Sequence, residues 1–270
     1  MKSKITGGAT ELAFTAKVLN KYDVKYYRCL DTGFIQTEDP FWLKEAYSSA
    51  ITKLDIGLIS RNEELRNKTL KLIQTYFSQD KRFLDYAGGY GMFTRMMRDK
   101  GLDFYHHDIY CENLFAKYFE LSDCIQQKDF EVITAFEVFE HLVNPIEEIG
   151  RIGDYGDSIF FTTVLQPMEL ESISDWWYIS KETGQHIAFY TATALEHTAK
   201  RLGYHFWTDG ISTHLFTKKL LNGNPFIDYK KEPYLIRTMK RKLSRFERKN
   251  NPCNRESLLQ RDFDYIKSKL

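Results

Sequence analysis

Paired cysteines, long apolar runs and an excess of charge of one sign are all missing from this sequence of 270 residues. Its four cysteines include no C-x-x-C spacing, and a tetrahedral zinc site needs clustered soft ligands, so we expect no metal site. No run of about 18 apolar residues occurs, which excludes a membrane-spanning helix, and the N-terminus has no apolar signal-peptide core. These absences predict a soluble, cytoplasmic protein with reduced thiols.

The formal net charge of +1 provides no overall attraction to nucleic acid, so we expect no nucleic-acid partner. The charge is nevertheless uneven, because residues 229–249 carry nine Lys and Arg side chains. Two interpretations stay open for this segment: an appendage that packs on the protein, or a surface that contacts anionic lipid or a lipid-linked substrate. The pattern does not predict an oligomeric state.

The sequence does contain enough hydrophobic residues, 43% of the total, to form a large core. Three zones follow from the patterning. Residues 1–80 are expected to form a mostly helical N-terminal cap, and residues 81–219 alternate between strand and helix patterns. Residues 220–270 begin at a Gly/Asn/Pro break and are expected to form a basic helical C-terminal extension.

The middle zone predicts an α/β fold. The buried strand candidates are RFLDYA, DFYHHD, EVITAFEV and SIFFTTVL, and the helix candidates are MFTRMMRDKG, PIEEIGRIG and TATALEHTAKRLG. The runs YHFWTDG and STHLFTKK follow each other closely, which suggests a closing antiparallel pair. Strands that alternate with helices favour a mostly parallel sheet with helices on both faces.

A glycine-rich turn, LDYAGGYG, lies between the first of these strands and its helix. Glycine lets the backbone approach a ligand, and the helix N-terminus presents free N–H groups at the carboxyl edge of the sheet. A dinucleotide cofactor needs G-x-G-x-x-G, whereas here the small residues Ala87, Gly89 and Gly91 alternate. We expect Ala87 to have a negative φ, where its methyl group costs little. A turn without a ligand is the alternative.

This turn resembles the first motif of class I S-adenosylmethionine-dependent methyltransferases, D-x-G-x-G-x-G after a strand. The segment DFEVITAFEVFEHLVNP resembles the E-V-x-E-H-x-x-x-P motif of the same family. The resemblance implies a Rossmann-like, mostly parallel, seven-stranded sheet and S-adenosylmethionine as the cofactor. It implies a cofactor-binding set made of Asp85, Ala87, Gly88, Gly89, Gly91, Asp108, Ile109, Phe136 and Glu137.

Two acids in this set have alternative roles. Asp108 ends the second strand and can accept bonds from both ribose hydroxyls, although it could instead cap the following segment. Glu137 is placed beside the transferable methyl group, although a cap or a buried charge is the alternative. If the acceptor is a hydroxyl, a base must take its proton, and His141 and His186 are the candidates because histidine titrates near neutrality. The expected catalytic set is therefore His141, His186 and Glu137.

The segment DWWYISKETGQH resembles one found in methyltransferases of bacterial surface-sugar pathways. It implies a substrate wall, although aromatic packing of a long loop is the alternative. The implied acceptor is a small molecule that offers a hydroxyl, such as a sugar or glycan precursor. Some sugar methyltransferases carry a cysteine-rich zinc module near the N-terminus, but only Cys29 is left here. The expected substrate-binding residues are Trp176, Trp177, Tyr178 and Gln185.

Two other functions compete with methyl transfer. A dinucleotide-dependent oxidoreductase would need the G-x-G-x-x-G fingerprint, which is missing. A non-catalytic module that binds the cofactor and assists a partner would keep the glycine turn without a working acceptor site.

Overall fold

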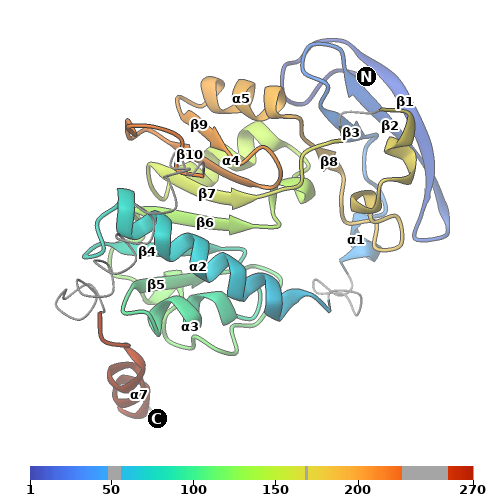
Figure 1. The fold of residues 1–270 in the computed structure, drawn as a ribbon. Helices are drawn as coiled ribbons and strands as arrows, with labels where there is room; N and C mark the ends of the chain where they lie inside the picture. The colour runs from blue at the N-terminus through green and yellow to red at the C-terminus, as the bar shows by residue number, and fades with distance from the viewer. Residues whose placement is uncertain (48–55, 168–169, 227–254, 270) are drawn as a thin grey trace, which may run out of the picture.

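The computed structural model describes residues 1–47, 56–167, 170–226 and 255–269, and they form two sheets that lie side by side (Figure 1). The larger sheet has the strand order β5-β4-β6-β7-β10-β9. Its strands are β4 (Arg82–Tyr86), β5 (Asp103–His107), β6 (Val132–Phe136), β7 (Ser158–Thr162), β9 (His205–Thr208) and β10 (Thr213–Thr217). Strands β5, β4, β6 and β7 are parallel, and β10 runs antiparallel to both neighbours. The α/β fold and the closing antiparallel pair are thus confirmed.

The expectation of seven strands is wrong for the described part of the chain, where this sheet has six. Beside β5, where another strand would pair, there is a single parallel bridge between His106 and Glu120. The segment between His106 and Glu120 explains why no further strand forms there. Asp108 Oδ1 accepts hydrogen bonds from two following backbone amides, and Asn113 Oδ1 accepts one from Ala116 N. Such local bonds compete with a strand ladder and hold the segment in turns.

Helices cover both faces of the larger sheet. On one face lie α2 (Leu58–Tyr76) and α3 (Met92–Arg98), and on the other lie α4 (Pro145–Gly153) and α5 (Ala192–Arg201). Neighbouring strand residues alternate between the two cores: Phe83 packs with α2 and α3, whereas Leu84 packs with α4 and α5. Because every central strand is buried on both faces, its sequence is a continuous apolar run.

The smaller sheet corrects the prediction of a mostly helical cap over residues 1–80. It has the order β1-β2-β3-β8, all antiparallel, with β1 (Thr10–Val18), β2 (Tyr22–Cys29), β3 (Ile35–Thr37) and β8 (Ala188–Phe189). Residues 15–18 and 23–26 alternate in exposure, and both segments are rich in the β-branched and aromatic residues that strands favour. After Pro40, the structure describes the short helix α1 (Leu43–Ala46), while residues 48–55 lie outside the described part.

The boundary expected at residue 80 does not separate the two sheets. Helix α2, which precedes it, packs on the larger sheet, and β8, which follows it, belongs to the smaller one. The short 3-10 turns η3 (Leu170–Asp175) and η4 (Trp177–Ile179) add Ile173, Tyr178 and Ile179 to the core of the smaller sheet. The residues expected to form a substrate wall are thereby carried to the junction of the two sheets.

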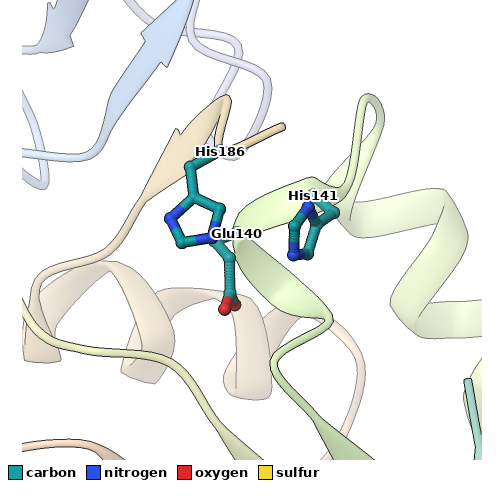
Figure 2. A group of neighbouring side chains, drawn as sticks. All are labelled: Glu140, His141 and His186. Carbon is teal, nitrogen blue, oxygen red and sulfur yellow. The ribbon is translucent and has the colours of Figure 1, made fainter. Parts of the chain in front are cut away.

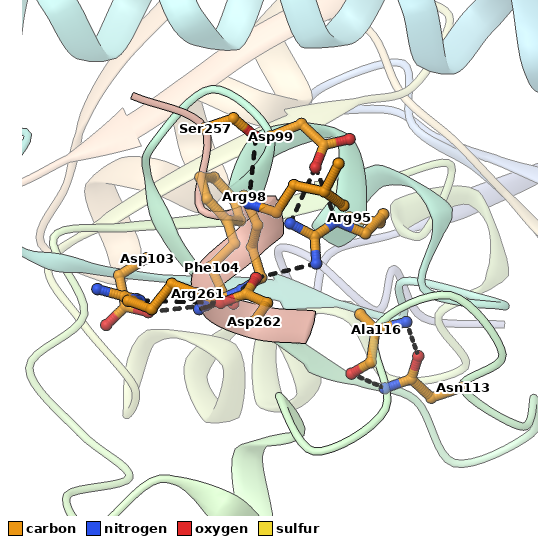
Figure 3. Close-up of polar contacts among 11 residues, drawn as sticks. Arg95, Arg98, Asp99, Asp103, Phe104, Asn113, Ala116, Ser257, Arg261 and Asp262 are labelled. Carbon is orange, nitrogen blue, oxygen red and sulfur yellow. Dashed lines mark hydrogen bonds and ion pairs between the residues drawn. The ribbon is translucent and has the colours of Figure 1, made fainter. Parts of the chain in front are cut away.

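A terminal helix, α7 (Leu259–Lys267), lies against α3 (Figure 3). Asp262 accepts hydrogen bonds from Arg98 Nε at 2.8 Å and from Arg95 Nη1 at 2.9 Å, and both Asp262 and Arg98 are buried. The basic segment 229–249 lies outside the described residues. Within the described ranges, the helices are too short or too polar to cross a bilayer.

Candidate functional site

A cavity of about 820 Å³ lies at the carboxyl ends of β4, β5 and β6. Its volume is in the range found for small-molecule binding sites. Three loops line it on the side of the larger sheet: residues 85–90, 107–111 and 136–138. On the other side it is lined by α1, by η4 and by residues 183–186 before β8. The carboxyl edge of a parallel sheet is where the open α/β folds bind ligands, and here the smaller sheet closes that edge.

Ala87, the first residue after β4, has a φ of +55°, which contradicts the expected negative value. The chain must turn sharply from the strand toward α3, and Gly89 also has a left-handed φ, of +57°. Ala87 is exposed and lines the cavity, so its methyl group makes few compensating contacts. An alanine in this conformation carries strain of about 1–2 kcal/mol, where a glycine carries none.

Gly88 is required by packing behind the loop. A Cβ atom there would lie 2.5 Å from Asp85 Oδ2 and 2.8 Å from the His106 ring. Asp85 itself is buried and accepts hydrogen bonds from Thr94 Oγ1 and Thr134 Oγ1, both at 2.9 Å. Its carboxylate therefore fastens β4 to α3 and β6 beneath the loop. Burial raises the pKa of Asp85 to about 6.

Asp108, at the end of β5, lines the cavity and touches the glycine loop. Its Oδ2 accepts a hydrogen bond from Gly89 N at 2.9 Å, and its Oδ1 accepts bonds from Tyr110 N and Cys111 N. Asp108 therefore both caps the following turn and lines the cavity. Since a carboxylate oxygen has two acceptor positions, Oδ2 has room for one more donor, such as a ribose hydroxyl.

Gly91 differs from the other loop residues because it does not line the cavity. It is the N-cap of α3 with a φ of +81°, and a Cβ atom would lie 2.3 Å from Asn113 Oδ1. The backbone of the glycine loop at Gly91 packs directly against the side chain of Asn113, which lies in the segment after β5. Gly91 therefore shapes the loop from behind.

The remaining residues of the expected cofactor set do line the cavity. Ile109 is 75% exposed, and Phe136 ends β6. Glu137 follows with a φ of +54°, and its backbone N–H donates to Thr162 Oγ1, which donates in turn to Glu137 Oε1. A non-glycine residue in this conformation is strained, and such residues concentrate at functional sites.

Glu140, His141 and His186 converge on one another (Figure 2). Glu140 and His141 lie on the 3-10 turn η2 (Phe139–His141), whereas His186 precedes β8, and one ligand atom from each lies within 4.8 Å of the others. The rings of the two histidines meet edge to face with centroids 4.9 Å apart. His141 and His186 line the cavity, as expected for the proposed catalytic pair.

Burial controls the charge of this cluster. It lowers the pKa of His141 to about 3 and that of His186 to about 4, so both rings are neutral at pH 7. Burial, together with the nearby Glu137 carboxylate, raises the pKa of Glu140 to about 8. Glu140 Oε1 accepts a hydrogen bond from the Tyr178 hydroxyl at 2.6 Å, while its buried Oε2 has no hydrogen-bond partner.

The expected substrate residues have different surroundings. Trp177 is 75% exposed and lines the cavity, which suits contact with an acceptor. Tyr178 and Gln185 also line it, but both are buried, and Gln185 Nε2 donates to Ala46 O. Trp176 does not line the cavity and packs against Tyr178 and Phe189, so the alternative of loop packing applies to it.

Sequence reasoning missed several aromatic residues of the cavity, among them Tyr47 and Tyr110, and did not assign Glu140 to the site. Tyr47 stacks on Tyr110 with centroids 5.1 Å apart and meets the His141 ring at 6.2 Å. Tyr47 follows α1, which belongs to the smaller sheet's core, and no sequence pattern brings it to β5. Glu140 could have been found, because its place directly before His141 in FEH puts a carboxylate and an imidazole on one turn.

The family model of the methyltransferase domain matches residues 59–208, more than half of the chain. That range includes the glycine loop, Asp108 and η2. No curated protein sequence matches the chain.

Solved structures similar to the chain include a 1,6-didemethyltoxoflavin-N1-methyltransferase from Burkholderia thailandensis with bound 1,6-didemethyltoxoflavin and S-adenosylhomocysteine. It is 10% identical with a TM-score of 0.47, over 70% of this chain and 96% of that chain. Another is magnesium protoporphyrin IX methyltransferase from Synechocystis PCC 6803 with bound S-adenosylhomocysteine, 8% identical with a TM-score of 0.43, over 64% of this chain and 90% of that chain.

The third is TnmH, 12% identical with a TM-score of 0.45, over 66% of this chain. This chain covers only 61% of the length of TnmH. Likenesses at this level carry no argument about substrate or mechanism, which must come from the site itself.

Proposed function

The chain belongs to the methyltransferase domain family, and the matched segment is an S-adenosylmethionine-dependent methyltransferase domain; from this premise we propose that the protein methylates a hydroxyl of a small acceptor of the sugar or glycan class. The observation that supports this most is the arrangement of one cavity with two different ends. The glycine loop and Asp108 form one end, and Trp177 and His186 form the other.

The residues of the first end suit S-adenosylmethionine. Asp108 Oδ2 can accept a ribose hydroxyl, and exposed Ile109 beside it offers an apolar surface for the adenine ring. The backbone of residues 87–89 borders the cavity and can approach the methionine part closely. Bound there, the cofactor would supply a methyl group on a positively charged sulfur, which is already activated toward an in-line displacement.

Residues of the second end suit a hydroxyl-bearing acceptor. The exposed Trp177 ring provides a flat apolar face of the kind on which a sugar ring packs, and its neighbours provide polar groups. The cavity volume of about 820 Å³ accommodates a cofactor and a small acceptor together. The main contribution of the protein to catalysis is then to align the two reactants.

The acceptor hydroxyl must lose its proton, and the cluster of Glu140, His141 and His186 is where the chain can promote this loss. In each histidine Nδ1 donates to a backbone carbonyl, so the unprotonated nitrogen is Nε2. As a general base, such an Nε2 would take the proton as the oxygen attacks the methyl carbon. A cytoplasmic location completes the proposal.

Isotope-labelled S-adenosylmethionine tests the reaction. We expect label to pass to at least one sugar or sugar nucleotide in an acceptor panel, and Trp177→Ala to raise KM for that acceptor about tenfold with little change in kcat. A protein that binds the cofactor but transfers no label to any acceptor would be the non-catalytic module instead.

Cofactor binding is tested separately by calorimetric titration with S-adenosylhomocysteine. We expect Asp108→Asn to weaken binding about tenfold or more, because the amide replaces a charged acceptor of hydrogen bonds. The control is Glu112→Gln, which removes a fully exposed acid of the same loop and should bind like the wild type. Equal affinity in all three proteins would contradict the assignment of Asp108.

A further inference from the structure

The Glu140–His141–His186 cluster has features that deprotonation of an acceptor does not require. It joins one carboxyl group and two imidazoles from the turn η2 and from the segment before β8, with their ligand atoms within 4.8 Å of one another. A general base needs a single unprotonated nitrogen, whereas this cluster holds two imidazoles beside one carboxyl group. We propose that this cluster is a binding site for a first-row divalent transition metal ion, such as Zn²⁺, Co²⁺, Mn²⁺ or Fe²⁺.

The hydrogen bonds of the two histidines prepare them as ligands. His141 Nδ1 donates to Gln185 O at 3.0 Å, and His186 Nδ1 donates to Tyr178 O at 2.6 Å. A carbonyl oxygen can only accept, so each neutral ring must carry its proton on Nδ1 and a lone pair on Nε2. Metal-binding histidines in proteins are held in the same manner, with the second nitrogen bonded to a carbonyl or carboxylate.

Glu140 has a buried carboxyl oxygen that lacks a hydrogen-bond partner within the described part of the chain, and this also favours a metal ion. Its side chain is fully buried, and Oε2 has no hydrogen-bond partner among the described residues, although Oε1 accepts from Tyr178 at 2.6 Å. A buried carboxylate oxygen without a partner costs free energy of roughly 1–3 kcal/mol or more. A divalent cation would satisfy this oxygen and would also balance the negative charge of nearby Glu137, which acts on the Glu140 carboxyl.

The ligand types indicate the class of metal. Imidazole nitrogen with a single carboxylate suits zinc, cobalt, iron or manganese better than Mg²⁺ or Ca²⁺, which prefer oxygen ligands. In a tetrahedral site with bonds of about 2.1 Å, ligand atoms are about 3.4 Å apart. The present limit of 4.8 Å therefore requires only small side-chain rotations.

The site is open toward the cavity. His141 and His186 line the cavity, whereas Glu140 is buried and does not, so a metal held by the three would be reached from the cavity. Three protein ligands with an open position are typical of catalytic rather than structural metal sites. The position faces the part of the cavity that we assign to the acceptor. With both Nε2 atoms bound to the metal, the ion would lower the pKa of the acceptor hydroxyl in place of a histidine base; this role rests on the proposed function, whereas the metal site itself does not.

Binding of Co²⁺ and Zn²⁺ to the full-length protein, freed of metal by a chelator, tests the site without cofactor or acceptor. Calorimetry should give one bound Co²⁺ per chain, with visible absorption bands of a low-symmetry nitrogen and oxygen ligand set. Glu140→Gln, which keeps the size of the side chain and an acceptor for Tyr178, and His186→Ala should each weaken Co²⁺ binding at least about tenfold. His205→Ala, at an exposed histidine of β9, is the matched control and should bind as the wild type does.

A measurement on the wild-type protein alone keeps the test independent of variant folding. The ¹⁵N chemical shifts of two imidazole Nε2 atoms should move on addition of one equivalent of Zn²⁺. Unmoved shifts, or equal Co²⁺ affinity in the wild type and both site variants, would overturn the proposal. Tight binding of Mg²⁺ with none of Zn²⁺ or Co²⁺ would also overturn it, since the imidazoles would then not be ligands.

Discussion

Two residues with left-handed backbone conformations follow directly after parallel strands of the larger sheet. Ala87 follows β4 with a φ of +55°, and Glu137 follows β6 with a φ of +54°. Both line the same cavity. Each is a residue type that resists this conformation, so the carboxyl edge of the sheet holds strain where we place the transferred methyl group.

Replacing Ala87 by glycine should relieve the strain at one of these positions. The relief of about 1–2 kcal/mol exceeds the entropic cost of a glycine in the unfolded chain, so we expect the free energy of unfolding to rise by roughly 0.5–1 kcal/mol. Urea denaturation measures this change. Ala192→Gly, at an exposed position of α5, is the control and should destabilise the protein; a loss of stability in Ala87→Gly would show that the loop is not strained.

At this scale the sequence predicted much of the site, for reasons that are local. Gly88, Asp108 and His141 each stand within a few residues of a strand end, so the strand pattern alone brings them to one edge. The conformation of Ala87 was not predictable in the same way, because the residue type argues against it. Nor was the meeting of Glu140 with His186, since 45 residues separate them in the chain and His186 leads into a strand of the other sheet.

At the scale of elements, the start of α3 depends on contacts behind the glycine loop. Gly91 caps the helix and packs against Asn113, whose Nδ2 donates to Ala116 O and Glu120 Oε1. These bonds shape the segment that replaces a seventh strand. The loop and the segment after β5 therefore form one packed unit, and a side chain at residue 91 would disturb both.

Comparison of two glycine substitutions isolates this packing. Gly91 and Gly203 have φ values of +81° and +77°, but a Cβ atom at Gly203 would meet nothing within 4 Å. Gly203→Ala should cost about 1 kcal/mol of unfolding free energy through strain alone, and Gly91→Ala roughly 2–4 kcal/mol because a clash is added. Chemical denaturation of both variants measures the difference. Equal losses would mean that Asn113 moves away at no cost.

Asp85 makes the junction of β4, α3 and β6 sensitive to pH. Burial raises its pKa from an ordinary value of 3.8 to about 6, against the opposing effects of His106, Thr94 and Thr134. The folded state therefore binds a proton more tightly than the unfolded state, and the contribution of Asp85 is most favourable below about pH 4. It is lost as pH rises through 6, by an amount on the order of 1–3 kcal/mol.

Asp85→Asn removes this titration and keeps the shape of the side chain. The free energy of unfolding of the wild type, relative to this variant, should fall as pH rises from about 4 to 6.5. Denaturant unfolding at several pH values gives both curves. A difference between the two proteins that is constant over this range would refute the raised pKa.

At the scale of the whole molecule, contacts between distant segments hold the parts together. The smaller sheet takes three strands from the first 40 residues and one from residues 188–189, and α7 returns to α3 through Asp262 (Figure 3). Strands β4, β6 and β7 of the larger sheet were predictable because each has a buried, mainly apolar centre. The pairing of β3 with β8 was not, because Gln36 and Ala188 carry no signal for a partner so far along the chain.

Asp262→Asn tests how much the docking of α7 contributes. The substitution leaves Arg98 buried with one charged partner fewer, which we expect to cost about 3–5 kcal/mol of unfolding free energy. Asp264→Asn, at an exposed acid of the same helix, should change stability by less than about 0.5 kcal/mol. Thermal denaturation distinguishes the two variants. A small effect of Asp262→Asn would mean that α7 adds little to the stability of the fold.

The pairing of Arg98 with Asp262 also means that Arg98 is synthesised well before its partner. Asp262 follows Arg98 by 164 residues, and at about 5–20 residues per second a ribosome needs roughly 10–30 s to make the chain between them. During that interval the Arg98 guanidinium, which lies over the Phe119 ring, has neither Asp262 nor the cover of α7. A nascent chain therefore completes its glycine loop well before α3, which follows that loop, is covered by α7, and chaperones and proteases in the cell would meet this partly covered form.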